Sequence, residues 1–540
     1  MKKYNIVKVL LITILVMVLL TWIFPAAYYS SELVDQGRLQ MGLSELFNYP
    51  LTAVSYFGHI AVFILLIGGF YGILYKIPAY RVFLDKVVKK FEGKEKVFLA
   101  IVTVLLSLGV SFAGLHIAYF LFIPLIISLI LLMGYDKIVA AMTVVGSVAV
   151  GFIGLTYSTT INSVLLSTLA LKNDYQIGVR FVLLLVGIVL LLFNIYMYIK
   201  LNGNKLIKKE VKEAKVEIDN KVVEVKKETT KTVKTTTKSS SKSKAATKST
   251  KGKSTSKSKS KNKAALKDGD IIVVKESVVK NDDNDSYLLP SRVGSQHKVW
   301  PFTLFFTLMF VLLVLAFINW NEGGFGIKLF DDVTKSVTEF KLFKFAIFGK
   351  LFGTTNAFGT WNVMDLFVPM ALVILLLSII YKVKFDDICD GFVAGVKKAA
   401  GPSLVIILLY TVLVITTYHP FQTTLYKAFL DISKTHLNII TTMIVTLLAA
   451  IFNVDALYSF QALLPYYVSV VTKVDNYALT GIIAQSMYGF ALLFAPTSFI
   501  LMSVLAYLKV SYCEWLKAVW KLLLELFVTL LVVFIILALI

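Results

Sequence analysis

The chain has 540 residues, 57% of them hydrophobic, with a formal net charge of +22 and a mean hydropathy of +0.77. Repeated apolar segments of about 18 residues or more are too many to hide in a soluble core, which excludes an ordinary soluble protein and predicts a polytopic membrane protein. The sequence has two cysteines, Cys389 and Cys513, too few for a disulfide framework or a cysteine-based metal site.

The first membrane repeat is predicted over residues 1–199. Its expected elements in chain order are a span at Val7–Tyr28, a span at His59–Tyr75, a re-entrant hairpin at about 97–133, an interrupted helix at 138–171 and a span at Val179–Ile199. Each hairpin arm has only about 16 apolar residues, and the AGLH tip, 113–116, lies between them. Two full spans would keep the same parity, but the short arms favour a hairpin whose tip is covered by protein.

The positive charge is concentrated between the two membrane halves. Residues 231–267 contain thirteen lysines and no acid, so the segment 200–298 is predicted to be a largely disordered cytoplasmic linker. A tether to anionic lipid or RNA is the functional alternative to a solvated loop. Because positive segments stay inside, we expect the N-terminus and the linker in the cytoplasm and the C-terminus outside.

The second half repeats the plan of the first. Its expected elements are a connecting transmembrane helix at 299–320, an extracytoplasmic loop at 321–361, and a second repeat at 362–540 with a hairpin at about 436–473 and an interrupted helix at 477–508. The segment YRVFLD from Tyr80 recurs as YKAFLD from Tyr426, before each hairpin. The predicted fold is therefore an all-α polytopic membrane protein with an inverted repeat, about nine transmembrane helices and two re-entrant hairpins.

Polar residues interrupt one apolar helix in each repeat. The sequence GLTYSTT follows GFI at Gly151, and APTS follows GFALLF at Gly489. At an unwound break, hydroxyls replace lost backbone hydrogen bonds, the amides of the next half-helix favour an anion, and free carbonyls take a cation. The predicted substrate-binding residues of the breaks are Ser158, Thr159, Thr160, Asn162, Pro496, Thr497 and Ser498.

The two hairpin tips carry ionisable residues. His116 at the first tip is a candidate proton-coupling group, or else a neutral histidine bonded to backbone. Asp455 at the second tip is a candidate ion-coupling group or partner of a substrate amino group, because an intramembrane acid is costly unless it has a function. Ser459 near the same tip is a further candidate for substrate binding.

Three segments carry a resemblance to a known family. They are Gly134–Gly154, Phe392–Ile406 and Pro496–Leu522, and they resemble the YfcC family of anaerobic C4-dicarboxylate carriers, in the ion transporter superfamily with an AbgT-like architecture. The resemblance implies nine spans with two hairpins, a homodimer, an elevator-like transport domain, and coupling to sodium, protons or a counter-substrate. Asn453 matches the family pattern and joins the substrate-binding candidates, whereas His116 stands where members commonly carry acidic residues.

The polar residues of the sequence distinguish a transporter from a channel or an enzyme. A channel needs a continuous polar lining and an enzyme needs paired acids, a metal cluster or an activated nucleophile, and the sequence contains no such motif. We therefore expect a secondary transporter of small carboxylates in a bacterial plasma membrane, with no cofactor and with Na⁺ or H⁺ as candidate coupling ions. Amino acids are the expected substrates; the alternatives are a dicarboxylate carrier of the same fold and a nontransporting membrane scaffold.

Overall fold

The computed structural model describes residues 5–30, 32–202, 298–320, 325–342, 345–353, 356–433, 437–472 and 477–539. By internal contacts the chain divides into a larger unit, Met1–Met197 with Asp282–Ile540, and a smaller unit, Tyr198–Asn281. The predicted linker lies outside the described residues from 203 to 297, and so does its lysine-rich segment. Everything below concerns the larger unit.

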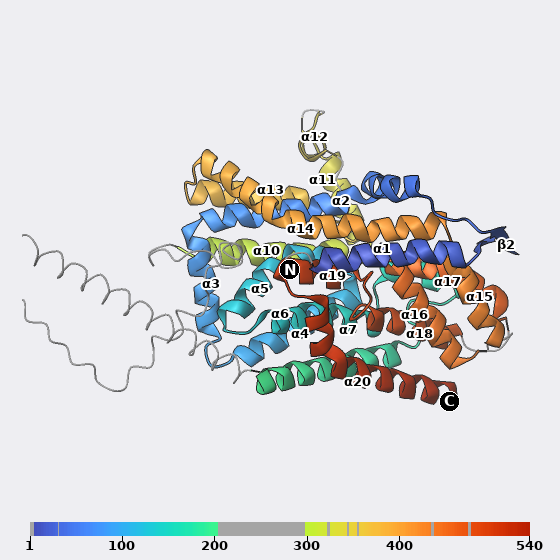
Figure 1. Ribbon diagram of the computed structural model, residues 1–540. Coiled ribbons are helices and arrows are strands. Elements are labelled where there is room, and N and C mark those ends of the chain that lie inside the picture. The colour runs from blue at the N-terminus through green and yellow to red at the C-terminus, as the bar shows by residue number, and fades with distance from the viewer. Residues whose placement is uncertain are drawn as a thin grey trace, which may run out of the picture. The chain divides into compact units, whose positions relative to one another are not determined.

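Long apolar helices dominate this unit (Figure 1). Among the described residues, seven helices are long and apolar enough to cross a membrane: α1 (Asn5–Ile23), α2 (Leu43–Lys76), α4 (Glu95–Ala113), the helix Ile177–Asn202, α10 (Trp300–Phe317), α14 (Phe385–Tyr418) and α20 (Tyr512–Leu539). Shorter apolar helices include α5 (Ile123–Leu132), α13 (Phe367–Ile380), α16 (Ile439–Phe452) and α19 (Phe499–Leu508). The prediction of an all-α polytopic membrane protein is confirmed.

One prediction at the edge of this plan is wrong. The first span was expected to reach Tyr28, but α1 ends at Ile23, and β1 (Ala26–Ser30) pairs antiparallel with β2 (Glu32–Gly37). Pro25 ends the helix because it has no backbone N–H to donate. The described part of the segment 321–361 contains α11 (Leu329–Glu339), α12 (Ile347–Phe352) and the short pair β3 (Lys341–Leu342) and β4 (Phe345–Ala346). Its placement as an extracytoplasmic loop stays a prediction.

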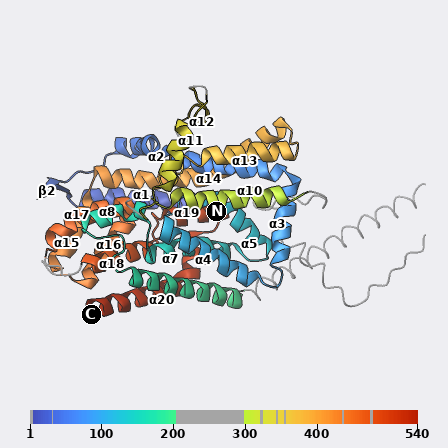
Figure 2. The same cartoon turned by 180° about the vertical axis from the view of Figure 1, so that it is seen from behind.

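The two longest described helices, α2 and α14, lie side by side in both views (Figures 1 and 2). Each has 34 residues. The Ser403 hydroxyl of α14 donates to the Ala61 carbonyl of α2 over 3.1 Å, so the backbones approach closely. Small residues at such crossings strengthen van der Waals packing, which must replace the hydrophobic effect inside a bilayer. This pair is the most extensive contact between helices in the described part of the unit.

The repeated sequence motif forms equivalent helices. α3 (Pro78–Lys90) and α15 (Phe421–Ser433) each bury their tyrosine completely, Tyr80 and Tyr426. Each also pairs a base with an acid one turn on: Arg81 with Asp85 at 3.0 Å, and Lys427 with Asp431 at 2.6 Å. The two helices lie at opposite ends of the unit in Figures 1 and 2, which fits two copies of opposite orientation.

Each of these helices precedes a helical hairpin and an interrupted helix. The hairpins are α4–η2 (Ala118–Leu121)–α5, and α16–α17 (Ala456–Val470). The first interrupted helix runs through α6 (Lys137–Ala141), a π-helical turn η3 (Met142–Gly146), α7 (Ser147–Ile153) and, after a break, α8 (Thr159–Thr168). The second is α18 (Tyr477–Ala491), a break and α19. These short helices fill the space between α14 on one side and α20 on the other (Figure 1).

Candidate functional site

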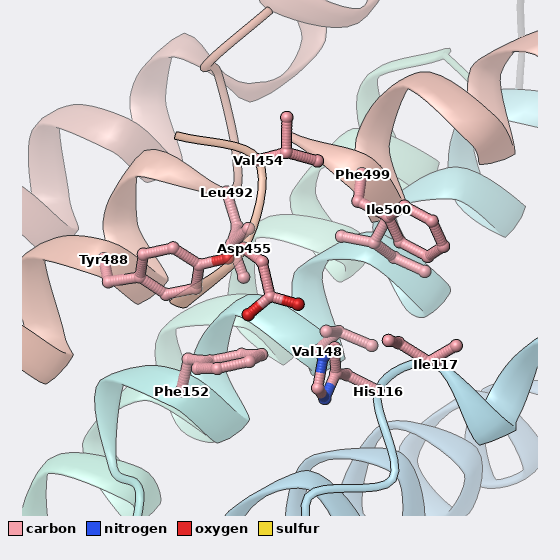
Figure 3. Close-up of a pocket in the computed structure, with 10 residues that line it drawn as sticks. All are labelled: His116, Ile117, Val148, Phe152, Val454, Asp455, Tyr488, Leu492, Phe499 and Ile500. Atoms are coloured by element: carbon pink, nitrogen blue, oxygen red, sulfur yellow. The ribbon is translucent and has the colours of Figure 1, made fainter. Parts of the chain in front are cut away.

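The two hairpin tips and the second break meet at one small cavity. Its volume is about 10 Å³, room for roughly a single water molecule. Residues from the first tip, α7, the second tip, α18 and the start of α19 line it: His116, Ile117, Val148, Phe152, Val454, Asp455, Tyr488, Leu492, Phe499 and Ile500 (Figure 3). Tips that are about 340 positions apart in the sequence therefore face each other here. None of the lining residues is a lysine or an arginine.

Asp455 is the N-cap of α17. Its Oδ1 atom accepts a hydrogen bond from the Leu457 amide over 2.9 Å, which satisfies one free donor of the helix start. Its Oδ2 atom has no hydrogen-bond partner among the described residues, and the carboxylate points into the cavity (Figure 3). The positive end of the helix dipole stabilises the charge. Asp455 is thus a structural cap that leaves one carboxyl oxygen free at the cavity.

His116 faces Asp455 across the cavity (Figure 3). Gly114 ends α4 in the left-handed region, at φ 68°, and this turn directs the chain back toward α7. The His116 Nδ1–H donates to the Gly114 carbonyl over 3.0 Å, because a carbonyl can only accept. Its Nε2 atom has no partner among the described residues, so it is free to contact a ligand or a proton.

Aromatic rings line the cavity beside the two ionisable residues (Figure 3). Phe152 packs edge-on against His116, with ring centroids 5.1 Å apart, and against Tyr488 at 5.0 Å. Tyr410, Tyr458 and Tyr488 all lie within electrostatic range of Asp455. Of these, Tyr488 lines the cavity next to Asp455.

At the first break, the polar side chains are only partly used. Ser158 is the N-cap residue of α8 but makes no capping bond, and its Oγ atom is buried without a partner among the described residues. The Oδ1 atom of Asn162 is buried and unpartnered in the same way. Thr159 and Thr160 lie in the first turn of α8, but their side chains are outside the described part of the chain. This break retains unused hydrogen-bonding capacity.

At the second break, the corresponding hydroxyls are used by the fold. Thr497 donates to the Ile451 carbonyl over 2.7 Å, tying the break to the end of α16. Ser498 donates to the Leu492 carbonyl over 2.9 Å and caps α19. Pro496, directly before Thr497, is half-buried and has no backbone N–H to donate.

The other two candidates at the second tip are bonded to their own helices. The Asn453 side chain donates to the Ala449 carbonyl over 2.9 Å at the end of α16. The Ser459 hydroxyl donates to the Asp455 carbonyl over 2.9 Å. Both bonds fix the backbone around Asp455, and neither side chain lines the cavity.

The sequence does not reveal which side chains donate hydrogen bonds to the free carbonyls of the two breaks. Arg180, fully buried, donates from Nε to the Leu155 carbonyl over 2.7 Å and from an Nη atom to the Thr156 carbonyl. Trp515, also fully buried, donates to the Leu493 carbonyl over 2.7 Å. A signal was present for Arg180, since a charge inside an apolar helix indicates a specific partner.

No group of three or more His, Cys, Asp or Glu side chains that could hold a metal ion occurs within the described ranges. The ionisable groups that meet in the cavity are one acid and one imidazole. This arrangement is suited to reversible binding of a small polar ligand between aromatic walls.

Comparison with known proteins gives the family. Neither the curated proteins nor the solved structures contain a significant match to the chain. The sequence profile of the C4-dicarboxylate anaerobic carriers (DcuC) matches residues 4–247 and 275–539, which is most of the chain. A carrier family also agrees with the apolar, many-helix architecture and points away from an enzyme. The chain belongs to the C4-dicarboxylate anaerobic carrier family of multi-pass membrane proteins.

Proposed function

We propose that the protein is a secondary transporter of small carboxylates and that its preferred substrates are amino acids. The observation that supports this preference is the free Oδ2 atom of Asp455, which points into the cavity opposite His116 (Figure 3). An amino acid brings an ammonium group to pair with Asp455, and its carboxylate suits the amides of α8 with the free hydroxyl of Ser158.

A C4-dicarboxylate is the second candidate, and the family match favours it. Such a substrate places a carboxylate near Asp455 with no lysine or arginine in the cavity lining to offset the repulsion. At about 4 Å and an effective dielectric constant of about 20, two like charges repel by roughly 4 kcal/mol. A dicarboxylate is therefore compatible with this site only if Asp455 is protonated or a cation accompanies the substrate.

The small volume of the cavity supports alternating access. With about 10 Å³ it is too small for a four-carbon acid, so the tips must separate before a substrate enters. We infer an elevator-like motion in which the hairpins and interrupted helices move against the α2–α14 pair. The alternative of a nontransporting scaffold predicts that no small carboxylate is taken up at all.

The proposal also covers the branch of the family, the membrane and its orientation, and the partners of the chain. The motif at Pro496–Leu522 supports the YfcC branch of the family. The lysine distribution supports a bacterial plasma membrane with the N-terminus and linker inside and the C-terminus outside. A homodimer, coupling by Na⁺ or H⁺ through His116 and Asp455, and binding of the linker to anionic lipid or RNA complete the proposal.

The test is uptake by the purified full chain in proteoliposomes. Labelled amino acids and labelled succinate are compared for the natural chain and for Asp455→Asn, which keeps an N-cap but removes the charge. Asp136→Asn is the matched control, because Asp136 caps α6 through a 2.8 Å bond to the Val139 amide away from the cavity. We expect Asp455→Asn to lose amino-acid affinity roughly 10- to 150-fold, as a charge-assisted hydrogen bond is lost.

The control should transport like the natural chain, and succinate uptake should be unchanged or improved in Asp455→Asn. Equal loss for both substrate classes would show that Asp455 acts only on the fold or the transport cycle. A natural chain that carries succinate and no amino acid would overturn the preference, and a chain that carries neither would support the scaffold.

A further inference from the structure

Arg180 is a fully buried guanidinium in the fourth position of the helix Ile177–Asn202. Besides Leu155 and Thr156, it donates to the Asn173 and Tyr175 carbonyls over 2.8 and 3.1 Å. Its charge lies over the Tyr175 ring, 4.2 Å from the centroid. Every partner is a neutral oxygen or a ring, so the guanidinium is held entirely by dipoles and π-electrons.

Acids do not explain the placement of this charge. Arg180 forms no ion pair within the described ranges; the acid within electrostatic range is Asp174, whose side chain is exposed. Burying an unpaired charge costs several kcal/mol unless its hydrogen bonds are well satisfied. The convergence of four carbonyls on one cation therefore indicates a cation site, not an incidental salt bridge.

The Leu155 and Thr156 carbonyls are free of helical bonds because α7 stops at Ile153. In transporters with interrupted helices, carbonyls of this kind coordinate the coupling cation. Here further donors share them: Gln485 donates to Leu155 over 3.2 Å and Asn162 to Thr156 over 3.5 Å. A cluster that could hold a sodium ion is thus already occupied by a side chain.

In the second repeat, neutral side chains donate hydrogen bonds to the free carbonyls of the break. Trp515 is also the fourth residue of its helix, α20, and donates to the Leu493 carbonyl over 2.7 Å. Tyr512 donates to the Phe494 carbonyl from the same helix turn. Since neutral donors are enough to cap a break, capping alone does not require the positive charge of Arg180.

We propose that Arg180 is a tethered cation that fills the carbonyl site of the first break in place of a free monovalent cation. The break then binds no alkali ion, and any coupling ion must act elsewhere. Removing the guanidinium exposes a latent site for Na⁺ or for free guanidinium. The uptake readout rests on the proposed transport function, whereas the stability readout is independent of it.

The test compares Arg180→Met with the natural chain and with Trp515→Phe, which removes a neutral donor at the matched position. Purified full-length proteins are heated in detergent with Na⁺ or with choline as the cation. We expect Na⁺ to raise the unfolding temperature of Arg180→Met by about 5 °C more than that of the other two proteins, as a newly bound ligand should. Methylguanidinium should replace Na⁺ in this effect.

In proteoliposomes, the ratio of uptake with Na⁺ to uptake with choline should rise roughly 5- to 150-fold in Arg180→Met relative to the natural chain. Arg180→Gln repeats both measurements with a polar replacement, so a misfolded Met variant does not end the test. An Arg180 variant that folds and responds to Na⁺ and methylguanidinium as the natural chain does would overturn the proposal. A stability response without uptake would leave the cation site intact and contradict the transport function instead.

Discussion

The two breaks differ in how their polar groups are used. At the second break both hydroxyls, of Thr497 and Ser498, are bonded to backbone carbonyls, and neutral side chains of α20 hold the carbonyls that the break frees. At the first break the Ser158 hydroxyl and an oxygen of Asn162 have no partner within the described ranges, and a buried cation holds the carbonyls. The second break is closed, whereas the first has capacity for a ligand.

This difference shows that a repeated backbone does not imply a repeated site. Both copies must interrupt a helix and satisfy its free carbonyls, and both do so from the fourth residue of the next helix. The polar groups that are not needed to bond these carbonyls determine where a ligand can bind. By that criterion the proposed substrate site combines the first break, where Ser158 has a free hydroxyl, with the second tip, where Asp455 lines the cavity.

The largest expected effect concerns the close packing of α18 against α7, the helices that end at the second and the first break. A Cβ atom at Gly489 of α18 would lie 2.6 Å from the Ile153 backbone nitrogen and 2.7 Å from the Ala149 carbonyl oxygen. Because backbone cannot yield as a side chain can, Gly489→Val should cost about 3 kcal/mol and lower the yield of folded protein. Gly178→Ala is the control, since nothing lies within 4 Å of its added carbon.

Size-exclusion chromatography of the detergent-solubilised proteins measures the result. Gly489→Val should elute largely as aggregate, and Gly178→Ala as the natural chain does. A monodisperse Gly489→Val of natural thermal stability would mean that α18 and α7 are not in contact at this point.

The next effect separates the two N-cap serines. Ser498→Ala removes a cap and leaves the Leu492 carbonyl unpaired, so it should lower stability by about 1 to 2 kcal/mol. Ser158→Ala removes a hydroxyl that has no partner within the described ranges, and should leave stability unchanged while weakening substrate affinity roughly 5- to 150-fold.

Thermal unfolding in detergent and concentration-dependent uptake measure the two quantities. Similar losses of stability in both variants would show that Ser158 has a structural partner after all. Unchanged affinity in Ser158→Ala, with normal stability, would place the substrate away from the first break.

The fold class and the general place of the site follow from the sequence because they depend on local patterns. The apolar stretches predict membrane helices, and the polar runs after Gly151 and Gly489 predict interruptions where α7 and α18 end. The matching motifs at Tyr80 and Tyr426 predict equivalent helices, because both tyrosines occupy the same buried position. These features need only the order of residues along one helix.

The roles of single polar residues depend on long-range contacts and could not be predicted. Ser158 and Ser498 look alike in sequence, and only the positions of distant carbonyls distinguish a free hydroxyl from a used one. The sequence places Arg180 in the predicted span Val179–Ile199 and does not reveal its acceptors, because these lie 24 or 25 positions earlier in the chain. Asp455 could have been recognised as an N-cap, but not as a residue that faces His116.

The smallest expected effect tests the repeated pairs of α3 and α15. In Lys427–Asp431 both side chains are about half exposed, so Lys427→Ala should lower stability by only about 0.2 to 0.5 kcal/mol. In Arg81–Asp85 the arginine side chain is 10% exposed, and Arg81→Ala also removes its buried stem, so it should cost more. Thermal unfolding of both variants gives the order. A larger loss from Lys427→Ala would mean that α15 is buried more deeply than α3, against the contacts described above, and that the repeats differ at their ends as well as at their breaks.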